Sequence, residues 1–145
     1  MSAIIPVESI ITNILIIRGK KVLLDRDLAS IYGVPTKRLN EQVKRNIERF
    51  PEDFMFQLNE SEKNELVANC DRYKTLKHSS ALPYAFTEHG ALMLSSVLRS
   101  EIAVKISILI VRAFVRLRDI LSTNEQIIQM INQHEQQIKI LFETV

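Results

Sequence analysis

The chain has 145 residues, of which 46% are hydrophobic, and its formal net charge is only +2. This length and composition predict one folded domain with room for an appendage, and they exclude a disordered or low-complexity chain. The single cysteine, Cys70, excludes a disulfide framework and fits a reducing compartment. No stretch has the length of a membrane span or the pattern of a signal peptide, so we expect a cytoplasmic protein without membrane contact.

The first predicted element is a β-hairpin. Residues 14–17 and 22–24 are apolar and rich in β-branched side chains, which favour strands. The segment between them, residues 18–21, contains a glycine and is predicted to form the tip. The tip carries three cationic side chains, Arg18, Lys20 and Lys21.

Residues 25–49 are predicted to form two short helices joined by a turn. In the first helix Leu28, Ala29 and Tyr32 share one face, and the carboxylate of Asp25 is placed to cap the N-terminus. Gly33 ends this helix, because the turn needs a positive φ angle, which glycine adopts without steric cost.

The second helix of this pair is amphipathic. Either Pro35 occupies its first position or Thr36 caps it. Leu39, Val43 and Ile47 recur at every fourth position and are predicted to pack on the first helix. The outer face then carries Thr36, Lys37, Asn40, Glu41, Lys44 and Arg45. This is the helix-turn-helix arrangement, whose second helix enters the DNA major groove; a helical hairpin with a solvated charged face is the alternative.

Positive charge is concentrated around these elements. Residues 18–49 contain nine Lys or Arg and four Asp or Glu. Residues 50–98 contain four Lys or Arg and seven Asp or Glu. Residues 99–121 are again cationic, with five Lys or Arg and two Asp or Glu. This asymmetry is typical of a protein that binds phosphates. The hairpin tip is then either a wing that touches backbone phosphates or a solvated turn whose lysines protect a sheet edge.

The chain up to residue 121 continues with short strands and helices. Proline at position 51 is predicted to stop the second helix, and residues 69–80 are expected to form an exposed, mobile loop. The predicted strands are residues 54–58 and 83–86. Predicted helices begin at Ser61, after a Thr87 cap and after a Ser100 cap, and the last of them extends to Leu121. Strands and helices without a regular βαβ repeat indicate an α+β fold.

The C-terminal part shows a heptad-like seam. From Ala103 to Val145, thirteen positions recur at spacings of three and four, and eleven of them are apolar. The early seam can pack on the protein's own core, and a capping-box pattern at Thr123 and Gln126 can break the helix. We therefore divide the chain into residues 1–121 and a tail, residues 122–145. The tail is expected to form a homodimer, with docking on the domain or on another protein as alternatives. The predicted interface residues are Asn124, Ile127, Ile131, His134, Ile138 and Leu141.

No pattern indicates an enzyme. The three histidines, His78, His89 and His134, match no zinc-ligand spacing with Cys70. The three glycines are isolated, so no phosphate-binding glycine loop is present. We therefore predict a non-enzymatic protein with no metal and no cofactor.

Two stretches, LLDRDLASIYGVPTKRLNEQVKRNIERFPEDFMFQL and PYAFTEHGALMLSSVL, resemble the phage-associated ORF-six-N-terminal domain, a relative of the KilA-N DNA-binding domain. The similarity extends from Val7 to Leu121. The resemblance implies a decorated helix-turn-helix that binds DNA, in phages, prophages and bacteria, without enzymatic activity.

Helix geometry then suggests which side chains meet double-stranded DNA. The predicted base contacts are Thr36, Lys37, Asn40, Glu41 and Lys44, and the predicted phosphate contacts are Arg18, Lys20, Lys21, Arg38 and Arg45. The competing prediction is a protein-interaction module, such as an antirepressor that binds a repressor protein instead of DNA.

Overall fold

The computed structural model describes residues 6–143, and for residues 134–143 it describes the backbone alone. The chain forms two compact units, Met1–Phe114 and Val115–Val145. The fold is α+β, as the sequence predicts: one small antiparallel sheet, several helices and a long C-terminal helix.

The sheet has the strand order β1-β2-β4-β3, and every neighbouring pair is antiparallel. Its strands are β1 (Leu15–Ile17), β2 (Lys20–Leu24), β3 (Met55–Gln57) and β4 (Tyr84–Phe86). In the hairpin of β1 and β2, Ile17 pairs with Lys20. The two turn residues, Arg18 and Gly19, have φ angles of 56° and 73°, as a tight two-residue hairpin requires. The predicted hairpin is confirmed.

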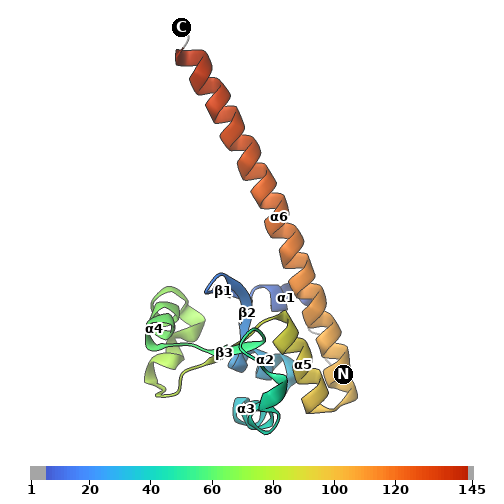
Figure 1. Ribbon diagram of the computed structural model, residues 1–145. Coiled ribbons are helices and arrows are strands. Elements are labelled where there is room, and N and C mark those ends of the chain that lie inside the picture. The colour runs from blue at the N-terminus through green and yellow to red at the C-terminus, as the bar shows by residue number, and fades with distance from the viewer. Residues whose placement is uncertain (1–5, 144–145) are drawn as a thin grey trace. The chain divides into compact units, whose positions relative to one another are not determined.

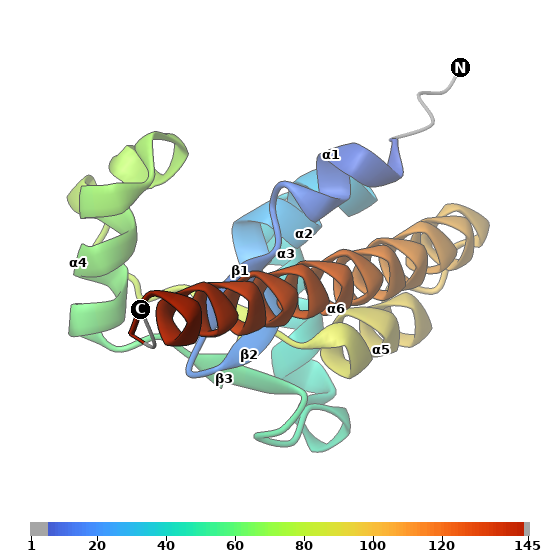
Figure 2. The same cartoon turned by 90° about the horizontal axis from the view of Figure 1, so that it is seen from above.

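The sheet separates two hydrophobic cores, because successive side chains of a strand point to opposite faces. Leu23 of β2 belongs to the larger core, and its neighbours Val22 and Leu24 belong to the smaller one. Figures 1 and 2 show α4 on one side of the strands and α2 and α5 on the other. The larger core is built by α1 (Val7–Ile11), α2 (Asp25–Tyr32), α3 (Thr36–Arg45), α5 (Glu88–Leu98) and the start of α6 (Glu101–Glu143). The smaller core is built by α4 (Glu60–Asn69) and the 3₁₀ helix η2 (Asp71–His78).

The predicted pair of short helices is present as α2 and α3. Gly33 ends α2 with a φ angle of 73°, and the N–H of Val34 donates to the Ala29 carbonyl at 2.9 Å. Pro35 is the N-cap residue of α3 and Thr36 is its first helical residue, so both predicted alternatives for the start of this helix are wrong by one position. On the inner side of α3, Leu39 and Val43 are buried in the larger core, as predicted.

Two further expectations for this segment are wrong. Asp25 is the first residue of α2 and not its cap; Leu24 occupies the cap position, with no side-chain hydrogen bond. The second helix ends at Arg45, since Asn46 leaves helical geometry at φ −126° and ψ 35°. Ile47 therefore falls in the 3₁₀ helix η1 (Ile47–Arg49), where 53% of it is exposed and it does not pack on α2.

The segment after β3 is more ordered than expected. Residues 69–80 were predicted to be a mobile loop, but residues 71–78 form η2, whose Tyr73 is fully buried. The preceding helix begins at Glu60 and not at Ser61, because Asn59 and Glu62 form a capping box. Thr87 and Ser100 cap α5 and α6, as predicted.

The last helix, α6, continues through two predicted interruptions. It extends past Leu121, and at Thr123 the hydroxyl simply donates to the Asp119 carbonyl at 3.0 Å. In the first unit, Ala103 and Ile110 are buried in the larger core, so the early seam packs on the protein itself. None of the described helices is long and apolar enough to cross a membrane.

Candidate nucleic-acid interface

The outer face of α3 is cationic and exposed. Around the helix axis this face lies opposite the buried Leu39 and Val43, which fix the orientation of α3. The exposed side chains are Lys37, Arg38, Glu41, Lys44 and Arg45, four cations and one anion. The structure thus brings together on one surface most of the predicted α3 contacts.

Thr36 and Asn40 lie at the edge of this face and are half-buried. The side-chain amide of Asn40 donates to Oδ2 of Asp25 at 3.0 Å. The other carboxylate oxygen of Asp25 accepts the backbone N–H of Arg26 at 2.8 Å. Asn40 therefore uses one of its donors inside the protein, to join α3 to the N-terminus of α2.

The hairpin tip is attached to the small-core side of the sheet. Nε of Arg18 donates to Oε2 of Glu62 at 2.8 Å, and Nη2 of Arg18 donates to Oε1 of Glu62 at 2.9 Å. Nη2 also donates to the Gln57 carbonyl at 3.2 Å. The hydrogen bond from Arg18 lowers the pKa of Glu62. The charge of Arg18 is thereby neutralised, and its prediction as a phosphate contact loses support.

The two lysines of the tip differ from Arg18. Lys20 is exposed, with its ammonium 5.9 Å from the centroid of the Phe56 ring, and Lys21 is half-buried. Neither is engaged as Arg18 is by a bidentate carboxylate, so both keep their charge available for a phosphate.

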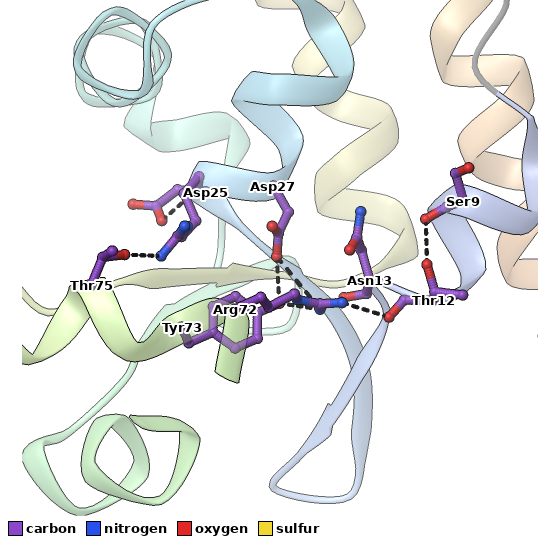
Figure 3. Close-up of polar contacts among 9 residues, drawn as sticks. Ser9, Thr12, Asn13, Asp25, Asp27, Arg72, Tyr73 and Thr75 are labelled. Atoms are coloured by element: carbon purple, nitrogen blue, oxygen red, sulfur yellow. Dashed lines mark hydrogen bonds and ion pairs between the residues drawn. The ribbon is translucent and has the colours of Figure 1, made fainter. Parts of the chain in front are cut away.

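A polar cluster joins η2 to α2 (Figure 3). The hydroxyl of Tyr73 donates to Oδ2 of Asp27 at 2.6 Å, and Arg72 donates to the same hydroxyl. Arg72 also donates to the carbonyl of Thr12 at 2.8 Å and to that of Asn13 at 3.2 Å. Arg72 thus holds η2 against the connection between α1 and β1.

Within this cluster, burial and the neighbouring polar groups shift the pKa of Asp27 in opposite directions. Burial raises the pKa of Asp27, against the hydrogen bond from Tyr73 and the charges of Arg72 and Arg26, which lower it. Burial also raises the pKa of Tyr73, and the acceptor Asp27 adds to that shift. The cluster holds a carboxylate in place where its ionised form is poorly solvated.

A second tie between the same two elements is Arg26, whose guanidinium donates to the Thr75 hydroxyl of η2 at 3.1 Å. Sequence reasoning missed these residues, because partners separated by more than 40 positions leave no local pattern.

Among the described side chains, the histidines and Cys70 do not form a cluster. The His89 ring stacks on Phe54 at 5.6 Å, His78 is exposed at the end of η2, and Cys70 is half-buried. The side chain of His134 lies outside the described residues. Across the part of the chain that the structure describes, no three His, Cys, Asp or Glu side chains could hold a metal ion.

The molecule is thus a small α+β domain that displays a cationic helix on its surface, followed by a long helix. The model of the ORF6N domain matches residues 12–97, more than half of the chain, so the chain belongs to the ORF6N domain family. This match confirms, over residues 12–97, the resemblance to this domain family that the sequence motifs indicate. No curated protein and no solved structure is significantly similar to the chain.

Proposed function

We propose that this protein binds double-stranded DNA sequence-specifically, with α2 and α3 acting as a helix-turn-helix, and serves as a phage-type regulator. One observation carries the proposal: α3 buries Leu39 and Val43 and turns four cations and Glu41 outward. A helix held in this way, with polar side chains of both charges on its free face, has the dimensions and chemistry that the major groove admits.

Base reading falls mainly to three side chains of α3. Lys37, Glu41 and Lys44 lie on the exposed face, where lysine favours guanine acceptors and glutamate accepts from cytosine. Thr36 and Asn40 stand at its edge, and Asn40 keeps its carbonyl oxygen and one N–H for adenine while its other N–H holds Asp25. Arg38 and Arg45 flank the reading side chains and are assigned to phosphates, together with Lys20 and Lys21.

The tail is proposed to pair two copies of the chain. In the second unit, Ile120, Ile127 and Ile131 lie along one face of α6 and are 43–50% exposed. Asn124 falls on the same face, where a polar residue fixes the register of paired helices. The further predicted seam residues, His134, Ile138 and Leu141, lie outside the residues with described side chains. A homodimer predicts an inverted-repeat DNA site with half-sites about 34–36 Å apart, or a multiple of that.

The test starts with the full chain and random duplex DNA, from which bound sequences are selected. Glu41→Ala and Lys44→Ala should weaken binding to the selected site by about 1–3 kcal/mol each, with little effect on random DNA, because a base contact carries discrimination. Arg45→Ala should weaken both equally, since a phosphate contact is blind to sequence. Lys105→Ala, exposed on α6, is the control. A wild-type chain that retains no duplex, or prefers none, would contradict the proposal.

The competing function is binding to a repressor protein. The exposed isoleucines of the tail favour it, because an apolar helix face also fits a partner of another kind. A stoichiometric complex with a repressor, formed by a chain that does not retain DNA, would establish this alternative.

A further inference from the structure

We propose that η2 is a second phosphate-binding surface, in which Lys74 and Lys77 hold the DNA backbone beside the groove occupied by α3. This inference rests on the proposed DNA binding and extends its footprint. It assigns a function to a segment that sequence analysis expects to be a mobile loop.

The N-terminus of α2 is contacted from two elements. Asn40 of α3 donates to Asp25, the first residue of α2, and the next residue, Arg26, donates to Thr75 of η2. Figure 3 shows Thr75 close to the first turn of α2 and to Asp25. This hydrogen-bonded series links η2 and α3 through the N-terminus of α2.

Two cations of the proposed interface lie close to the edge of α3 that Asn40 occupies. Lys37 precedes Asn40 by three residues and Lys44 follows it by four, so the three side chains are neighbours along the helix surface. Lys74 immediately precedes Thr75 on the other element. The two elements that carry these lysines, α3 and η2, are therefore both hydrogen-bonded to the N-terminus of α2.

The cations of η2 also lie together. Lys74 and Lys77 are three residues apart, and in a 3₁₀ helix such side chains stack on one face. They line a hollow between η2 and α4 with His78 and Asn64, and none of the residues lining it is acidic. The α4 acids Glu62 and Glu65 line a different hollow, beside β1.

Among the described ion pairs, Lys74 is paired with Asp71, whose carboxylate lies 3.0 Å from the ammonium. Both side chains are largely exposed, at 65% and 94%, so this pair is weak and a DNA phosphate can replace it. Lys77 has no such competitor among the described ion pairs.

The segment is held in position before any DNA arrives. Tyr73 is fully buried and its hydroxyl binds Asp27, while Arg72 binds two carbonyls of the connection between α1 and β1. An ordered segment loses little conformational entropy when it binds, which favours contact with a rigid duplex backbone.

The experiment compares Lys74→Gln/Lys77→Gln with Lys105→Gln/Arg112→Gln, a matched pair of exposed cations on α6. For each protein, Kd is measured over a range of salt on a duplex that carries the selected site. The η2 variant should reduce the slope of log K against log salt by about 2, since each lysine accounts for about one phosphate. Base preference should not change, and the α6 variant should keep the wild-type slope.

A second measurement uses Lys77→Gln alone, which leaves the Lys74–Asp71 pair intact, and duplexes shortened from one end. The wild type should lose affinity when flanking phosphates are removed, and the variant should lose less. Circular dichroism and thermal unfolding check that each variant is folded.

The outcomes separate the two proposals. If the η2 variants keep the wild-type slope and length dependence while Lys37→Gln/Lys44→Gln weakens binding, this inference is wrong and DNA binding through α3 stands. If the wild type binds no duplex at any salt, the proposed function itself is wrong.

Discussion

The side-chain amide of Asn40 donates a hydrogen bond to Oδ2 of Asp25 at 3.0 Å, which joins the middle of α3 to the first residue of α2. Asp25 is 6% exposed, so little water can replace this partner. The side chain that sequence analysis assigns to adenine thus also sets the distance between the two helices of the proposed helix-turn-helix.

Asn40→Ala should therefore lower the free energy of unfolding by about 1–3 kcal/mol, because Oδ2 of the buried Asp25 carboxylate loses its donor while Oδ1 keeps only the N–H of Arg26. Urea unfolding measures this loss. In a double-mutant cycle with Asp25→Ala, the coupling between the two residues should be about 0.5–3 kcal/mol. Strictly additive effects would show that the hydrogen bond contributes nothing to stability.

Two glycines should respond to substitution for different reasons. A Cβ at Gly90 would lie 2.0 Å from the carbonyl oxygen of Phe54, which is backbone and cannot move aside, whereas a Cβ at Gly33 would meet nothing within 4 Å. We expect Gly33→Ala to cost about 1–2 kcal/mol through its positive φ, and Gly33→Asn less. Gly90→Ala should cost more than either in thermal unfolding. Equal losses at both positions would contradict the steric explanation for Gly90.

Asp27 should make stability depend on pH. Burial raises its pKa in the folded state, so its contribution is fully present below the pKa of the unfolded chain and is lost as the pH rises through the folded pKa. Between pH about 3 and about 7, the wild type should lose stability relative to Asp27→Asn. Tyr73→Phe should enlarge this loss, because it removes a hydrogen bond that lowers the same pKa. Parallel stability curves for wild type and Asp27→Asn would refute the assignment.

At the hairpin tip, Arg18 and the lysines should behave differently in DNA binding. Arg18→Gln should leave the salt dependence of DNA binding unchanged, since Glu62 already neutralises the guanidinium. Lys20→Gln/Lys21→Gln should reduce the salt slope by about 2 if both lysines contact phosphates. An unchanged slope for the lysine variant would remove the hairpin from the DNA footprint.

The tail should determine the number of copies. Ile127→Glu/Ile131→Glu should convert a dimer into a monomer in sedimentation analysis, because charges on a helix–helix seam are desolvated. Gln129→Glu/Gln133→Glu introduces the same charge on exposed positions away from the Ile127 and Ile131 face and should leave the mass unchanged. A wild-type chain that sediments as a monomer would overturn the proposed homodimer.

The elements that follow from local patterns could be predicted from the sequence. Leu39 and Val43 alone determine which face of α3 is buried, and Gly33 marks the end of α2, because both effects act within one helical turn. The hairpin tip is likewise encoded in the Arg18-Gly19 pair and its flanking strands.

Features that depend on distant partners could not be predicted. Tyr73 is a polar-looking residue in a charged segment, and only Asp27, 46 residues earlier, reveals why it is buried. Arg18 looks like a free cation until Glu62, 44 residues later, is placed beside it. Helix α1 also has too few residues to show a period, although Ile10 is fully buried.

The position of β2 between the two cores makes unfolding of the unit Met1–Phe114 cooperative. Leu23 packs in one core, and Val22 and Leu24 pack in the other. Unfolding of either core therefore removes packing contacts from the strand that the other core also needs. We expect the amides of this strand to exchange with deuterium last of all, and damage on the α4 side to loosen α3 as well. A destabilising substitution far from the proposed DNA contact would then abolish DNA binding, because both cores unfold together.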